Sequence, residues 1–79
     1  MPMYSKPQLG QIKTPKELGE IIRAFRKKQN LTLDKVSGLT GLSMRFISEL
    51  ERGKQTAELG KALELINKIG LEIIIQSCG

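Results

Sequence analysis

The stretch that most constrains this 79-residue chain is residues 31–53, LTLDKVSGLTGLSMRFISELERG. It contains two short segments with helical apolar spacing, and Gly41 lies between them. Thr32 is a good N-cap for a first helix that runs to about Thr40. Glycine adopts positive φ without a Cβ clash, so Gly41 allows a tight turn between two steeply crossing helices.

The second segment has a clear inward face. Ser43 is a good N-cap, and Phe46, Ile47 and Leu50 follow at the spacing of one apolar stripe. Ser37 precedes the turn, where the first helix nears the second and only a small side chain fits. This is the layout of a helix-turn-helix, a DNA-reading motif: a short helix, a glycine turn and a second helix with one apolar side.

The outward side of the second segment is the candidate DNA-reading surface. Arg45 is the first choice for reading a base, because a guanidinium can bond guanine O6 and N7 together; the alternative is an i, i+4 ion pair with Glu49. Met44 could rest on a thymine methyl group, or be simply an exposed methionine. The predicted base-reading residues are Ser43, Met44, Arg45, Ser48 and Glu49. The predicted phosphate-binding residues are Thr32, Arg52 and Lys54.

Composition agrees with a polyanionic partner. The net charge is +5, which favours nucleic acid or an acidic protein surface, although such a charge also serves solubility. The chain has no histidine and a single cysteine, Cys78, so we expect no metal site, no cofactor and no enzymatic activity. A lone cysteine and the absence of a membrane-spanning run predict a cytoplasmic, nucleoid-associated protein with no membrane partner.

The flanking segments suggest three parts. Residues 1–13 are predicted to be a flexible arm, residues 14–70 the DNA-binding domain, and residues 71–79 a dimerisation strand with a tail. Thr14 and Pro15 start a helix whose buried stripe comprises Leu18, Ile21, Ile22 and Phe25.

A further helix is predicted after Gly53, with Thr56 as its cap. One face of this helix is expected to comprise Leu59, Ala62, Leu63, Ile66 and Ile69. Leu65 widens the stripe beyond the needs of a small core, which suggests a second contact surface.

The end of the chain changes character. Three consecutive isoleucines after Leu71 favour a strand, and a lone strand needs a partner; the alternative is a frayed hydrophobic tail. The simplest partner is the same segment of a second copy, paired antiparallel about a two-fold axis. Such a dimer would place its recognition helices roughly 34 Å apart and favour a palindromic target. The predicted dimerisation residues are Leu65, Ile69, Leu71, Ile73, Ile74 and Ile75.

Several strings resemble the XRE, or lambda-repressor-like, helix-turn-helix family. The resemblance runs from Leu18 to Ile69 through I-R-A-F-R, L-T-L-D-K-V, T-G-L-S and F-I-S-E-L-E-R-G-K. Within that family, the T-P-K-E-L opening and the closing hydrophobic strand resemble HipB-like antitoxins. The resemblance implies a mainly α fold: a bundle of four to five helices with a C-terminal β-strand that pairs across a homodimer.

The same resemblance implies a function and one structural contact. The function is a repressor of double-stranded operator DNA that also binds and restrains a HipA-like serine/threonine kinase toxin. The contact is an ion pair between Arg26 and Glu51. The alternatives are a phage-type or metabolic repressor without a kinase partner, or the DNA-binding subunit of a system whose toxin a separate protein neutralises. Leu33 stands where such repressors usually carry a phosphate-contacting Gln, and Leu39 makes the back of its helix unusually apolar.

Overall fold

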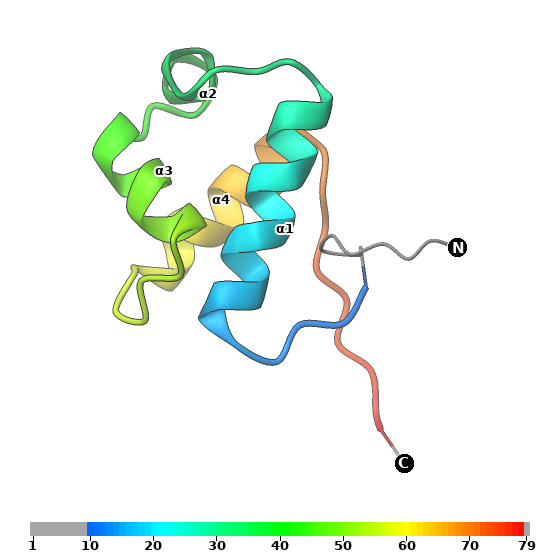
Figure 1. Ribbon diagram of the computed structural model, residues 1–79. Helices are drawn as coiled ribbons and strands as arrows, with labels where there is room; N and C mark the ends of the chain where they lie inside the picture. The colour runs from blue at the N-terminus through cyan, green and yellow to red at the C-terminus, as the bar shows by residue number, and fades with distance from the viewer. Residues whose placement is uncertain (1–9, 79) are drawn as a thin grey trace.

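A computed structural model describes residues 10–78 and contains four helices in that range. They are α1 (Pro15–Lys28), α2 (Leu33–Thr40), α3 (Met44–Glu51) and α4 (Leu59–Ile69) (Figure 1). The expectation of a mainly α, helix-turn-helix bundle is confirmed. Most of the predicted arm, residues 1–9, and the terminal Gly79 lie outside the described residues.

Local capping sets where the first three helices begin. The hydroxyl of Thr14 accepts the backbone N–H of Glu17 at 3.1 Å, and that of Thr32 accepts the N–H of Lys35 at 3.1 Å. Ser43 does the same at α3 for the N–H group three residues on, at 3.0 Å. These bonds satisfy N–H groups that the first turn of a helix leaves without a partner, so the predicted starts are confirmed.

The core lies where the helices meet. α1 packs against α3, and α2 packs against both α3 and α4. The apolar side chains buried in this shared core are Ile22, Val36, Leu42, Ile47, Leu50, Ala62, Leu65, Ile66 and Ile69. Each helix therefore contributes its apolar stripe to one core, as the spacing of these residues predicts.

The fourth helix differs from its prediction. It begins at Leu59 with Glu58 as N-cap, and Thr56 lies in the preceding turn rather than at the cap. Leu59 is 68% exposed, whereas Leu65 is fully buried, so the stripe is rotated relative to the predicted one. Leu65 and Ile69 lie in the chain's own core, which corrects their assignment to a contact with a second copy.

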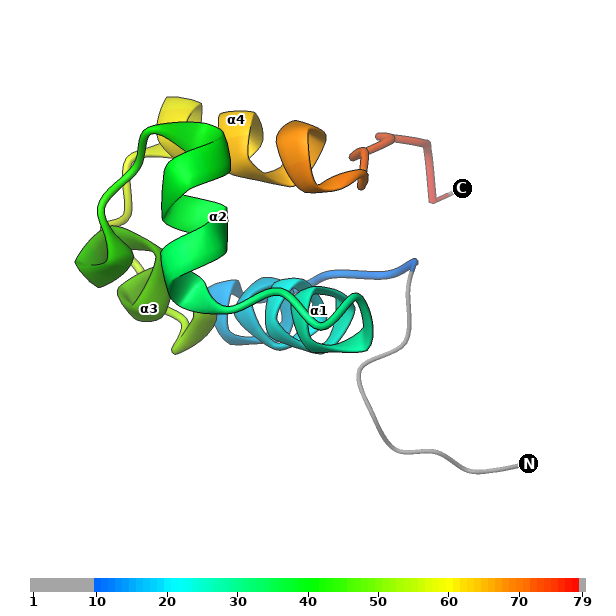
Figure 2. The same cartoon turned by 90° about the horizontal axis from the view of Figure 1, so that it is seen from above.

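The C-terminal segment, residues 71–78, is extended and leaves the bundle (Figures 1 and 2). Leu71 packs against the core, but the exposed fraction rises to 73% at Ile74 and 93% at Ile75. No strand occurs among residues 10–78 of the single chain, so pairing of this segment with a second copy stays a prediction. None of the helices in the same range is long and apolar enough to cross a membrane.

Candidate nucleic-acid interface

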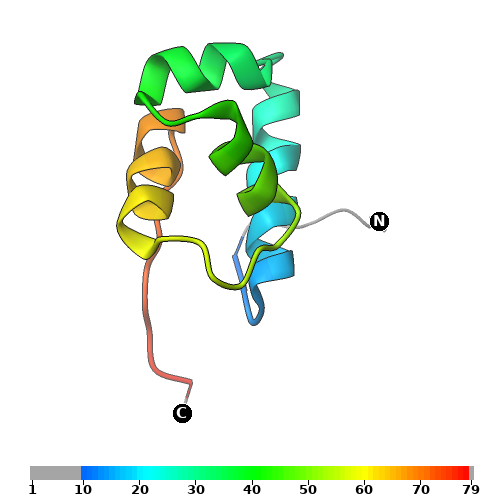
Figure 3. The ribbon, with the colours of Figure 1, turned by 90° about the vertical axis from the view of Figure 1, so that its left-hand side faces the viewer.

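One side of α3 faces away from the core. Figure 3 looks onto this part of the molecule, with α2 and α3 toward the viewer, and Figures 1 and 2 place residues 71–78 on the opposite side. The side chain of Arg45 is 87% exposed, and Met44 is also exposed. Ile47 and Leu50 point inward and are almost fully buried. Among the described residues, no part of the C-terminal segment covers the surface around Arg45.

The turn between α2 and α3 is fixed by hydrogen bonds. Gly41 has φ +78°, the left-handed conformation that its position predicts. The Ser37 hydroxyl donates to the Leu42 carbonyl at 2.6 Å. Thr40, which the sequence did not single out, donates through its hydroxyl to the Val36 carbonyl at 2.8 Å and accepts the Leu42 N–H at 3.2 Å. Its position directly before the turn glycine is the sequence signal that would have identified it.

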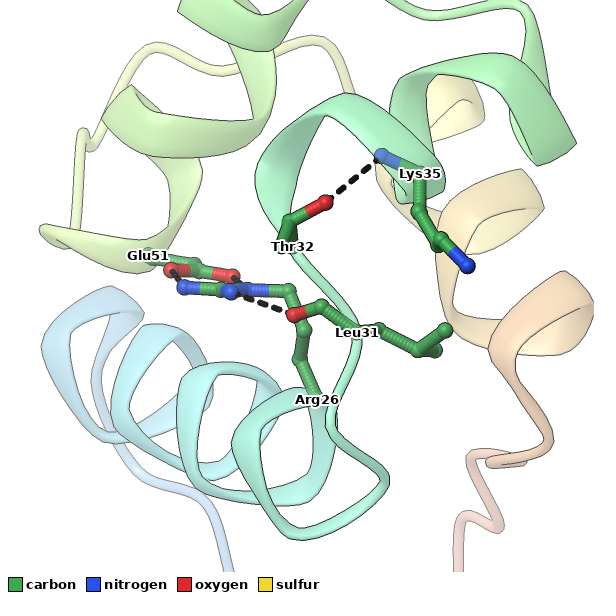
Figure 4. Close-up of polar contacts among 5 residues, drawn as sticks. All are labelled: Arg26, Leu31, Thr32, Lys35 and Glu51. Carbon is green, nitrogen blue, oxygen red and sulfur yellow. Dashed lines mark hydrogen bonds and ion pairs between the residues drawn. The ribbon is translucent and has the colours of Figure 1, made fainter.

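A buried ion pair joins α1 to the end of α3 (Figure 4). Arg26 Nε lies 2.6 Å from Glu51 Oε2, and Arg26 Nη2 lies 3.0 Å from Glu51 Oε1. The side chains are only 9% and 5% exposed. The hydrogen bonds that Arg26 donates to the Glu51 carboxylate raise the pKa of Arg26 above its ordinary value, so the guanidinium stays charged. The ion pair that the family resemblance implies is therefore present.

The same guanidinium also contacts the segment leading into α2. Arg26 Nη1 donates to the carbonyl of Leu31 at 2.8 Å, one residue before the Thr32 cap (Figure 4). One side chain thus links α1, the start of α2 and the end of α3. This linkage fixes the two helices of the motif relative to each other.

Two glycines permit the close packing that this linkage requires. A Cβ on Gly19 of α1 would lie 2.5 Å from the carbonyl oxygen of Glu51 in α3. Gly53 follows α3 with φ +87°, and a Cβ there would lie 2.7 Å from the Cα of Lys16. Neither position has room for a side chain, so the start of α1 and the end of α3 approach each other backbone to backbone.

A second, exposed ion pair lies on the outward side of α3. Arg45 Nε lies 3.2 Å from Glu49 Oε2, so the predicted i, i+4 pair is present in the free protein. Lys54 Nζ lies 3.1 Å from Glu49 Oε1, a contact that spacing along one helix did not predict. The hydrogen bond from Lys54 and, to a smaller extent, that from Arg45 lower the pKa of Glu49 below its ordinary value, so this carboxylate is negative at neutral pH.

The turn after α3 determines the position of Lys54. The N–H of Gly53 donates to the Leu50 carbonyl at 3.0 Å, and the N–H of Lys54 donates to the Glu49 carbonyl at 3.1 Å. This bonding, with a left-handed glycine, is the Schellman arrangement that ends many helices. It returns the chain over the last turn of α3 and brings Lys54 beside Glu49.

The eight residues predicted to contact DNA thus fall into two groups. Seven of them are on α3, at its N-cap or in the turn that follows it, with Ser43, Arg45, Arg52 and Lys54 exposed and Ser48 and Glu49 half-buried. Thr32 is exposed at the start of α2, where its hydroxyl already caps the helix. Lys61 of α4, which the sequence did not single out, has its ammonium 5.9 Å from the centre of the Phe46 ring.

Comparison with solved structures shows what this fold is similar to. A chain of a HipB–O4 20mer complex superposes with a TM-score of 0.82 at 15% sequence identity, covering 90% of this chain and 100% of that chain. A chain of a HipA–HipB–O2–O3 complex gives the same score, identity and coverage. At this identity the likeness establishes the fold.

Sequence comparison identifies the family as well as the fold. An uncharacterised HTH-type transcriptional regulator, y4mF, of Sinorhizobium fredii (strain NBRC 101917 / NGR234) is 44% identical over 68 residues, which cover 86% of this chain and 90% of that protein. The helix-turn-helix family model matches residues 22–75, a range that contains α2, the turn at Gly41 and α3. The chain therefore belongs to the XRE-type helix-turn-helix family of DNA-binding transcriptional regulators.

Proposed function

We propose that this protein is a sequence-specific transcriptional repressor that binds a palindromic operator as a homodimer in the cytoplasm. The observation that carries the proposal is the uncovered outward side of α3, where Arg45 is 87% exposed on a helix whose other side is locked into the core. Arg45 is assigned to base reading, together with Ser43, Met44, Ser48 and Glu49. Arg52, Lys54 and Thr32 are assigned to phosphate binding.

Homodimerisation through residues 71–75 is the second part of the proposal. Ile74 and Ile75 are apolar and almost entirely exposed in the single chain, on an extended backbone that can add to a sheet. Pairing with a second copy would bury them and supply backbone hydrogen bonds. The contact would comprise Leu71, Ile73, Ile74 and Ile75, without Leu65 and Ile69, which the chain's own core already buries.

We further propose an antitoxin role, in which the repressor binds a HipA-like serine/threonine kinase. The support is structural likeness to a chain from a HipA–HipB–O2–O3 complex, together with apolar residues left exposed on α2 and α4. Leu39 on α2 is 59% exposed and Leu59 on α4 is 68% exposed. The alternative is a phage-type or metabolic repressor without a kinase, or one whose toxin is restrained by another protein.

DNA binding is tested with 30-base-pair duplexes enriched by the protein from a random library. Affinity for an enriched duplex should exceed that for a scrambled one of equal composition and fall steeply with salt. The expected log–log slope is about −0.9 for each phosphate neutralised. Failure to enrich any sequence, or binding that salt leaves unchanged, would contradict the proposal.

Dimerisation is tested by removing residues 71–79 and measuring mass by sedimentation. The truncated chain should be monomeric and bind the enriched duplex more weakly, because each monomer contacts only one half-site. A truncated chain that stays dimeric would move the contact elsewhere.

The antitoxin role is tested with a kinase encoded beside this gene. Adding the protein should lower autophosphorylation of the kinase in proportion to the complex formed. A stable complex with unchanged kinase activity would contradict the antitoxin role, and transcriptional repression would then be the remaining proposed function.

A further inference from the structure

The exposed cluster of Arg45, Glu49 and Lys54 has an arrangement that base reading alone does not require. Glu49 binds Arg45 through Nε, the inner nitrogen of the guanidinium, at 3.2 Å. Within residues 10–78 the two terminal nitrogens of Arg45 make no hydrogen bond, and the side chain is 87% exposed. The pair therefore holds the guanidinium by one edge and leaves its outer fork free.

That outer fork is the part that reads guanine. Two parallel N–H donors match the O6 and N7 acceptors of guanine in the major groove. A free arginine side chain samples many rotamers, and fixing it on binding costs conformational entropy. A carboxylate that holds the inner nitrogen in advance reduces this cost without competing for the two donors that the base needs.

The carboxylate is itself held in place. Its second oxygen accepts from Lys54 Nζ at 3.1 Å, and Lys54 is fixed by its backbone bond to the Glu49 carbonyl. The positive φ of Gly53 turns the chain so that this backbone bond can form. Lys16 leaves no space for a side chain at Gly53. The Glu49 side chain is only 24% exposed, against 87% for Arg45. Glu49 is thus the restrained partner and Arg45 the presented one.

We infer that Glu49 is a positioning residue that sets the sequence specificity of this protein, by presenting Arg45 to guanine and withholding Arg45 from phosphates. The inference rests on the proposed DNA-reading function. On random DNA, a guanidinium that moves from Glu49 to a phosphate exchanges one anionic partner for another and leaves Glu49 with one cation fewer beside the polyanion. On a guanine-containing site, Arg45 gains two bonds and keeps the one to Glu49.

This role predicts opposite effects on the two kinds of DNA. In Glu49→Ala, affinity for the scrambled duplex should rise by about fivefold, because Arg45 becomes available to phosphates and a negative charge near them is removed. Affinity for the enriched duplex should fall by about tenfold, because Arg45 is no longer positioned. The salt dependence on scrambled DNA should steepen by about 0.9 for each additional phosphate contacted. A loss of folding would instead lower both affinities together.

Two further variants complete the experiment. Glu49→Gln keeps an oxygen acceptor for Arg45 Nε but not the charge, so it should recover part of the affinity for the enriched duplex while binding scrambled DNA more tightly than wild type. Glu64→Ala is the matched control, because Glu64 forms an equivalent i, i+4 pair with Lys68 at 3.0 Å on α4 and its loss changes the net charge equally. It should leave the ratio of the two affinities within about twofold of wild type.

The measurement is fluorescence anisotropy with the full-length protein on both duplexes across a salt series. Opposite changes in Glu49→Ala, absent in Glu64→Ala, would support the inference. Equal changes on both duplexes, or an unchanged ratio, would overturn the inference and leave DNA binding by the wild type intact. A wild type that enriches no sequence would overturn the proposed function as well, so the two failures are distinguishable.

Discussion

Two arginine–glutamate pairs involve α3, and they differ chiefly in burial. Arg26 and Glu51 have side chains that are 9% and 5% exposed, and the guanidinium bonds within the chain through Nε and both terminal nitrogens. Arg45 and Glu49 are 87% and 24% exposed, and their hydrogen bond uses Nε alone. The same two residue types therefore make a structural linkage where water is excluded and a solvent-exposed pair where it is not.

The largest expected effect comes from breaking the buried pair. Glu51→Ala leaves Arg26 charged without its carboxylate in the packed contact between α1 and α3. The free energy of unfolding should fall by about 3–5 kcal/mol, a large part of the stability of a small domain. Urea unfolding followed by circular dichroism measures it.

A double variant separates the loss of the pair from the isolated charge. Arg26→Met combined with Glu51→Leu should be less destabilised than Glu51→Ala alone, because no charge is left buried. A Glu51→Ala protein that loses less than about 1 kcal/mol would show that the linkage contributes little.

The next effect concerns the backbone contact that brings the buried pair together. Gly19→Ala places a methyl group against the carbonyl oxygens of α3, so the helices must separate. The free energy of unfolding should fall by about 1–3 kcal/mol. An unchanged melting transition would contradict the close approach of α1 and α3.

The exposed pair predicts a change in binding with little change in stability. Arg45→Lys keeps the charge but removes the two-pronged fork, so the preference for the enriched over the scrambled duplex should fall by about tenfold. The free energy of unfolding should stay within about 0.5 kcal/mol of wild type, since this side chain is exposed. Equal weakening on both duplexes would assign Arg45 to phosphates instead.

The smallest effect tests a glycine that lacks a packing role. Gly38 lies in α2 with open space around it, in contrast to Gly19. Gly38→Ala should raise the free energy of unfolding by about 0.5–1 kcal/mol, because alanine loses less backbone entropy on helix formation. A destabilised Gly38→Ala protein would indicate that something covers this part of α2.

The features that the sequence predicted well are those set by neighbouring residues. Thr14, Thr32 and Ser43 cap helices through N–H groups only three residues away, and Gly41 ends α2 through its own backbone conformation. Such short-range signals are readable without knowledge of the fold.

The sequence did not predict features that depend on contacts between distant parts of the chain. The spacing of α4 allows two overlapping apolar stripes, and contact with α2 selects the one containing Leu65 rather than Leu59. The bond between Lys54 and Glu49 depends on how Gly53 turns the chain back, so helical spacing did not predict it. Pairing of residues 71–75 depends on a second chain and stays a prediction.

In the proposed complex, DNA contacts the outward side of α3 through Arg45. The most direct test is two-dimensional NMR of the labelled protein titrated with an enriched duplex, following backbone amides and the arginine Nε–H groups. We expect the largest shifts for residues 43–54 and for the Nε–H of Arg45, with the Nε–H of the buried Arg26 nearly unchanged. Shifts centred instead on α1 or on residues 71–78, with the Arg45 signal unmoved, would contradict it.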